Sequence, residues 1–216
     1  PVPVLLFSHG FGGMRVQSFG LTSHLASRGY VVVAPDHPGR MLGDVLPCLI
    51  SPPLEGCDLS GFGNDPAVED LDVAFEWVEW AAKQPDWRTL LNTERVGLFG
   101  HSAGAGSTTT VGERDERYSA LVPMAGGGAV SRDVPVLRID ASCDGFVPSA
   151  DETVLDELTD GRFIQIQGGG HMAFTELCTL DLGTLADDVV APREDANTAI
   201  LPQLRGLAVD GCPTEL

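Results

Sequence analysis

Ser102 stands at the centre of a pentapeptide, Gly100-His101-Ser102-Ala103-Gly104, that could supply a reactive hydroxyl. A mostly apolar run at 95–99 precedes it and predicts a buried strand, and the small residues after it can open a helix. A sharp strand-to-helix turn lifts the serine hydroxyl above the sheet and requires glycine two positions to either side. The pattern therefore predicts a nucleophilic serine at such a turn.

Two further polar side chains follow predicted strands later in the chain. A strand at 136–139 runs into a loop that contains Asp144, and a strand at 162–166 runs into a glycine-rich loop that ends in His171. A serine hydroxyl is a poor nucleophile at neutral pH unless an imidazole accepts its proton, and a carboxylate can orient that imidazole. Ser102, His171 and Asp144 could form such a relay.

The five histidines differ in their suitability as the base. His9 and His101 lie inside glycine-rich segments and are interpreted as structural. His24 lies in a predicted helix, and His37 follows a predicted strand. His171 lies in a loop after the last predicted strand, where an imidazole can reach over the sheet, so we expect it to be the base.

A glycine-rich loop near the N-terminus could stabilise developing negative charge. The apolar run 4–7 predicts a strand, and it leads into His9-Gly10-Phe11-Gly12-Gly13. Backbone N–H groups must approach a substrate carbonyl closely to stabilise its oxyanion, and glycine permits that approach.

Together these segments resemble the α/β-hydrolase superfamily, in which the nucleophile, acid and base follow one another in the order Ser, Asp, His. Within it they look most like the dienelactone-hydrolase-like serine esterases, a neighbourhood that includes platelet-activating-factor acetylhydrolase-like enzymes and bacterial cutinases and polyester hydrolases. The resemblance implies a serine carboxylic-ester hydrolase that forms an acyl-enzyme and needs no metal or organic cofactor. An acyltransferase with the same triad and a non-catalytic binding protein are the alternatives.

The resemblance also assigns roles to single residues. Asp144 is favoured over Asp140 as the acid, because the family often shows an acid followed by an apolar residue and a proline, as at Phe146 to Pro148. The N–H groups of Phe11 and Ala103 would form the oxyanion hole. Cutinases usually carry methionine where this chain has Ala103, which disfavours a polyester substrate.

Strands and helices alternate along the chain and predict the α/β fold that the resemblance implies: a mostly parallel sheet of about six strands with helices on both faces. We expect helices at 18–28 and 65–84 and a C-terminal helix at 196–208. About ten residues separate a strand that ends near Ala125 from Pro135, which leaves no room for a cap domain. Residues 1–216 are expected to form one catalytic domain.

The composition limits the partners. A formal net charge of −18 repels nucleic acid, and no apolar run approaches the roughly 20 residues of a membrane span. We expect an ester, small or polymeric, as the partner. Residue 1 already stands just before the first predicted strand, so we expect any signal peptide to be absent from this chain.

The five cysteines are many for a reducing cytosol, and their spacing does not suggest a zinc site. Cys48 could pair with Cys57, and Cys178 with Cys212, leaving Cys143 free. Cys143 with Cys178 is another possible pairing, and buried free thiols are a third interpretation. Disulfides would indicate a secreted or periplasmic protein.

Overall fold

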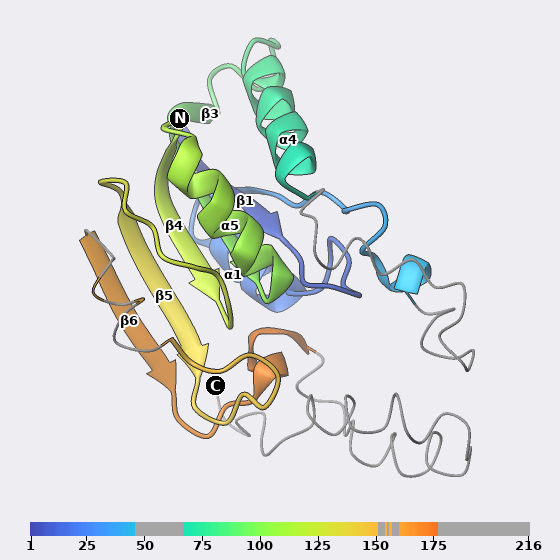
Figure 1. Ribbon diagram of the computed structural model, residues 1–216. Coiled ribbons are helices and arrows are strands. Elements are labelled where there is room, and N and C mark those ends of the chain that lie inside the picture. The colour runs from blue at the N-terminus through green and yellow to red at the C-terminus, as the bar shows by residue number, and fades with distance from the viewer. Residues whose placement is uncertain (46–66, 151–153, 155, 157–159, 177–216) are drawn as a thin grey trace.

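The computed structural model describes residues 1–45, 67–150, 154, 156 and 160–176 (Figure 1). Its elements in chain order are β1 (Val2–Ser8), α1 (Phe19–Ser27), β2 (Val31–Val33), α4 (Ala67–Ala81), β3 (Leu91–His101), α5 (Ala103–Arg114), β4 (Tyr118–Met124), β5 (Pro135–Ala141), β6 (Asp160–Ile166) and the short 3-10 helix η1 (His171–Phe174). The expected C-terminal helix and the four cysteines Cys48, Cys57, Cys178 and Cys212 lie outside the described residues. Cys143 has a free thiol.

Six parallel strands form the sheet, in the order β2-β1-β3-β4-β5-β6. Because all strands run the same way, their carboxyl ends meet at one edge. The chain passes from β1 to β2 on one side and later to β3 on the other, so the strand order reverses between β1 and β3. In open α/β sheets such a switch point is where ligands bind. The α/β sheet predicted from the sequence is confirmed.

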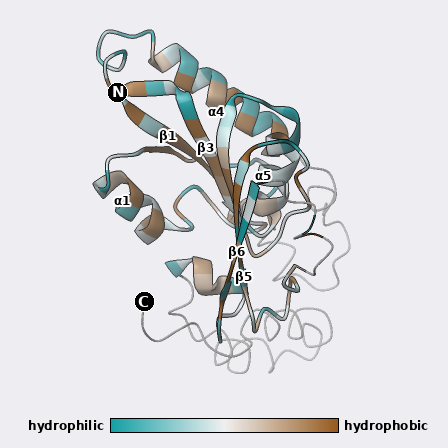
Figure 2. Ribbon diagram, turned by 90° about the vertical axis from the view of Figure 1, so that its left-hand side faces the viewer, coloured by the Kyte–Doolittle hydropathy of each residue, from teal (hydrophilic) through white to brown (hydrophobic). Residues whose placement is uncertain are grey.

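Each face of the sheet has its own apolar layer because side chains alternate along a strand. Val4 and Leu6 of β1 pack in the larger cluster with α4 and α5, whereas Leu5 and Phe7 point into the smaller cluster, which includes Leu21 of α1. Figure 2 shows α1 on one side of the sheet and α4 and α5 on the other. Helices therefore cover both faces, as expected.

Helix α4 buries the stripe that its sequence predicts. Leu71, Phe75 and Val78 are each at most 1% exposed, and they recur every three or four residues, which places them on one helix face. The Phe75 ring also meets the edge of Tyr118 from β4, with the ring centroids 5.2 Å apart. The helix is thereby fixed against the middle of the sheet.

No cap domain interrupts the sheet between β4 and β5. The connection at 125–134 is described throughout and contains no helix or strand. None of the described helices is long and apolar enough to cross a bilayer; the longest of them, α4, has 15 residues.

Three histidines are buried in the fold without being charged. His9, His37 and His101 are each at most 2% exposed. Burial, with a smaller contribution from a neighbouring histidine, lowers the pKa of His37 and of His101 to about 3, and burial also lowers the pKa of His9. An unfolded histidine, by contrast, binds a proton near pH 6.5. Below that pH these histidines bind protons in the unfolded chain but not in the folded chain, so acid favours unfolding.

We predict that the free energy of unfolding is greatest above pH 6.5 and falls as the pH is lowered toward 3. Each histidine that stays neutral in the fold should contribute a slope of about 1.4 kcal/mol per pH unit well below pH 6.5. Urea unfolding at several pH values between 7.5 and 5 measures this slope. His101→Asn should make this slope shallower by about one histidine's contribution, and equal slopes in the wild type and the variant would contradict the prediction.

Candidate active site

Ser102 occupies a strained turn between β3 and α5. Its φ is 58° and its ψ −120°, a conformation that non-glycine residues rarely adopt. The main-chain N–H of Ser102 donates to the carbonyl of Met124 at 2.9 Å, which fixes the turn to β4. A Cβ at Gly100 would collide with the main chain of Gly104, and one at Gly104 with the carbonyl of Ser8. The two glycines flanking Ser102 are therefore required by close packing.

The structure brings together the three side chains that the sequence singles out. His171 Nε2 lies 2.9 Å from Ser102 Oγ, and His171 Nδ1 lies 2.7 Å from Asp144 Oδ2. The side chains of His171 and Asp144 are only 3% and 1% exposed, whereas Ser102 is partly exposed. Three segments far apart in the sequence thus form one continuous hydrogen-bonded line that ends at a hydroxyl open to solvent.

Asp144 is held as a carboxylate that faces the imidazole. Burial raises its pKa, but hydrogen bonds from His171 and from the N–H groups of Val147 and Phe146 outweigh burial and leave the pKa below its ordinary value. An ionised carboxylate accepts a proton but cannot donate one. His171 therefore carries its proton on Nδ1 and turns the lone pair of Nε2 toward Ser102.

Asp140, the alternative acid, is engaged elsewhere. Its carboxylate pairs with Arg138 Nε at 2.9 Å, and both side chains are at most 4% exposed. It also accepts the N–H of Ala150 at 2.7 Å. Asp140 thus balances a buried guanidinium and anchors the chain beyond the loop that carries Asp144.

Hydrogen bonds from main-chain N–H groups join the loops that carry the acid and the base. The N–H of Cys143 donates to the carbonyl of Gly169 at 2.9 Å, and the N–H of Gly168 donates to Ser142 Oγ at 2.8 Å. The ring of Phe146 lies 5.1 Å from that of His171. The two loops therefore support each other directly beside the imidazole.

The glycine-rich loop after β1 lies against the nucleophile turn. A Cβ at Gly10 would approach the Ser102 Cβ to 3.2 Å. Phe11 is the next residue along this loop, and Ala103 is the first residue of α5, so the N–H of Ala103 has no acceptor within the helix. Both residues that the sequence predicts as oxyanion donors therefore lie in the segments adjoining Ser102.

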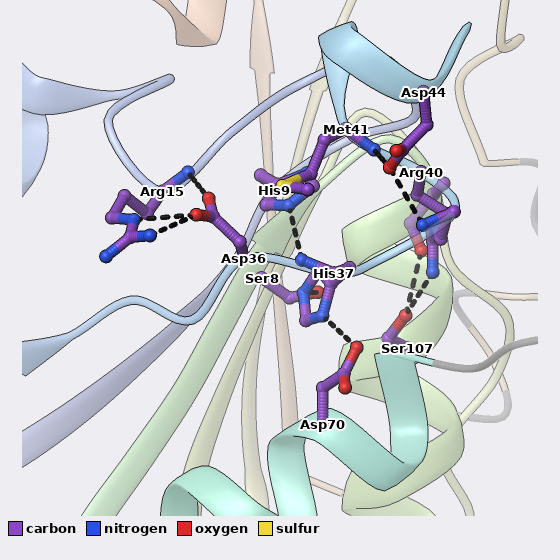
Figure 3. A network of polar contacts seen from close by, with 12 residues as sticks. Ser8, His9, Arg15, Asp36, His37, Arg40, Met41, Asp44, Asp70 and Ser107 are labelled. Carbon is purple, nitrogen blue, oxygen red and sulfur yellow. Dashed lines mark hydrogen bonds and ion pairs between the residues drawn. The ribbon is translucent and has the colours of Figure 1, made fainter.

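A buried polar network supports this loop from behind (Figure 3). His37 accepts from Ser8 Oγ at Nε2 (2.9 Å) and donates to Asp70 at Nδ1 (3.0 Å). Its main-chain N–H donates to His9 Nε2, so the proton of the neutral His9 ring sits on Nδ1 and bonds the carbonyl of Gly10 at 2.8 Å. The serine, histidine and aspartate repeat the pattern of the first site, but Ser8 is fully buried and cannot reach a substrate.

The sequence patterns gave no sign of Gln17, yet its side chain lies inside the site. Its carbonyl oxygen accepts the N–H of Gly10 at 2.9 Å, and its amide lies 2.8 Å from His101 Nδ1. A single polar residue just before α1 has no periodicity or motif that could have revealed these contacts. Within the part of the chain that the structure describes, no three His, Cys, Asp or Glu side chains form a metal-binding group.

Two known proteins are similar to this chain in sequence or in fold. A probable 1-alkyl-2-acetylglycerophosphocholine esterase of Arthroderma benhamiae is 27% identical over 133 residues, which are 58% of this chain and 32% of that protein. A ferulic acid esterase from Streptomyces cinnamoneus superposes with a TM-score of 0.60 at 23% identity, covering 97% of this chain and 61% of the other. The chain thus spans about a third of the curated relative and three fifths of the solved one.

The family model described as the alpha/beta hydrolase fold matches residues 3–126, more than half of the chain. That span contains the glycine-rich loop after β1 and the turn around Ser102. The chain therefore belongs to the alpha/beta hydrolase fold family.

Proposed function

We propose that this protein is a serine carboxylic-ester hydrolase in which Ser102, His171 and Asp144 act as a catalytic triad. The observation that carries the proposal is the continuous line of hydrogen bonds from Asp144 through His171 to the partly exposed hydroxyl of Ser102. The Ser102 hydroxyl lies at the carboxyl edge of the sheet, beside the switch point between β1 and β3.

The proposed reaction has two halves. His171 Nε2 accepts the proton of Ser102 Oγ as that oxygen attacks the ester carbonyl, and Asp144 stabilises the imidazolium that forms. The tetrahedral intermediate collapses, the C–O bond to the alcohol breaks, and the imidazolium returns its proton to the alcohol. Water then attacks the acyl-enzyme with His171 again as base, which releases the acid and restores Ser102.

The N–H groups of Phe11 and Ala103 would stabilise the negative oxygen of both tetrahedral intermediates. The N-terminus of α5 adds the positive end of its helix dipole at the same place. Donors fixed in advance cost little reorganisation during the reaction, and losing one typically lowers the rate about a hundred- to a thousandfold.

The printed names of the two relatives support a carboxylic ester as substrate, since one is an acetylglycerophosphocholine esterase and the other a ferulic acid esterase. The absence of a cap in the described connection at 125–134 supports an open site that takes a bulky or polymeric ester, as in cutinases. Ala103, where cutinases carry methionine, weighs against a polyester. We further propose that residues 1–216 act as one domain in a secreted or periplasmic setting, which the five cysteines favour.

Replacing Ser102 by Ala should lower kcat/KM for p-nitrophenyl esters by several orders of magnitude, because no nucleophile remains. Covalent labelling by a fluorophosphonate should vanish as well. Ser27→Ala, which removes an exposed hydroxyl on α1, is the matched control and should keep both ester hydrolysis and fluorophosphonate labelling. Labelling that persists in Ser102→Ala would refute the assignment, and a wild-type protein that neither labels nor hydrolyses would indicate a non-catalytic binding protein.

Exchanging each candidate acid separately tests the role of Asp144. Asp144→Asn should lower kcat about 10³- to 10⁴-fold, because the amide no longer holds the productive tautomer of His171. Asp140→Asn should act mainly on stability, since it leaves the Arg138 guanidinium buried without its counter-charge. Steady-state kinetics and urea unfolding of both variants separate the two effects; a larger loss of kcat in Asp140→Asn would reverse the assignment.

An alcohol added as a second acceptor decides between hydrolysis and acyl transfer. We expect water to remain the main acceptor, so that free acid dominates the products over a range of added alcohol concentrations. Chromatographic measurement of acid and new ester gives the ratio. Ester formation that exceeds hydrolysis at dilute alcohol would identify an acyltransferase with the same triad. Running the assay over acyl chains of rising length, together with a polyester film, would define the substrate.

A further inference from the structure

The Gln17 side chain is folded into the glycine-rich loop after β1. Its Oε1 accepts the N–H of Gly10 at 2.9 Å and lies where a Cβ at Gly13 would have to stand. The loop also closes on itself, because the N–H of Gly13 donates to the carbonyl of Gly10 at 3.0 Å. Gln17 therefore fills the inside of the turn that carries Phe11.

The other end of the same amide contacts the nucleophile turn. Gln17 Nε2 lies 2.8 Å from His101 Nδ1, and an amide nitrogen can only donate. His101 must therefore accept at Nδ1 and carry its proton on Nε2. Burial keeps this ring neutral by lowering its pKa to about 3, so it has one N–H to give.

That N–H reaches the loop of the base. His101 Nε2 lies 2.8 Å from the main-chain carbonyl of His171, which accepts it. The two imidazole rings are 4.8 Å apart, and the His101 ring also packs at 5.6 Å from Phe174 in η1. The carbonyl that His101 holds thus belongs to the same residue whose side chain faces Ser102.

We propose that Gln17 is a positioning residue that couples the oxyanion loop to the base loop through His101. The donors and acceptors run in one direction, from Gly10 N–H to Gln17, from Gln17 to His101, and from His101 to the carbonyl of His171. The inference rests on the proposed function, because it assigns Gln17 to the alignment of groups used there. Gln17 is half-buried, so its exchange disturbs the core less than that of the fully buried His101.

Two substitutions separate the two bonds of Gln17. Gln17→Met keeps the approximate shape and removes both bonds, whereas Gln17→Glu keeps an acceptor for Gly10 and loses the donor to His101. Gln84→Met is the matched control, since Gln84 is also half-buried and its side chain donates to the carbonyl of Trp80 far from the site. Thermal melting verifies that each variant is folded.

The readouts are kcat and KM for a p-nitrophenyl ester and the inhibition constant of an aryl trifluoromethyl ketone. That ketone forms a bond from Ser102 Oγ to its carbonyl carbon and leaves an oxyanion, so it reports transition-state alignment. We expect Gln17→Met to lower kcat about ten- to a hundredfold with KM within threefold of wild type, and the inhibition constant to rise in step with the loss. Gln17→Glu should show the same trend to a smaller degree.

A folded Gln17→Met variant that keeps wild-type kcat and ketone affinity would overturn the inference, as would a change confined to KM. Fluorophosphonate labelling of wild-type Ser102 distinguishes this failure from that of the proposed function. If wild type is labelled and Gln17→Met is unaffected, only the role of Gln17 fails. If wild type is neither labelled nor active, the ester hydrolase and the positioning role fail together.

Discussion

The contact between the start of α5 and the end of β1 is the constraint on which the rest of the site depends. Gly104 lies so close to the carbonyls of Ser8 and His9 that no side chain fits between them. This contact brings the turn around Ser102 against the loop that begins at Gly10. Because β1 and β3 are neighbours in the sheet, both segments also emerge at the same edge. Main-chain packing therefore sets the distance between a hydroxyl and the N–H groups beside it.

Neutral histidines of defined tautomer turn this packing into an aligned site. His9 accepts from a main-chain N–H, His37 donates to a carboxylate, and His101 accepts from an amide. Each of these partners can either only donate or only accept a hydrogen bond, so each ring carries its proton on a defined nitrogen. Figure 3 shows the His9 and His37 side chains with their hydrogen-bond partners. Acid disrupts this order because every added proton turns an acceptor into a donor.

The sequence was most informative where residue type and spacing have a single physical reason. Glycines at 100 and 104 predict the tight turn, and Ser102, Asp144 and His171 lie in hydrogen-bonding contact. Strand limits were harder: β3 begins at Leu91 instead of 95, since Val2 pairs with Leu91 across a register shift in β1. The bonds of Gln17 could not be predicted, because they depend on where three separate loops meet.

The sealed Ser8–His37–Asp70 network has a consequence for how enzymes are recognised from coordinates. It has the same residue types, the same ring nitrogens in the same roles and comparable distances as the group around Ser102, yet Ser8 is fully buried. A search by template geometry alone would score two centres in this molecule. Solvent access to the serine oxygen, rather than its hydrogen bonds, distinguishes a serine that can react from one that has a structural role.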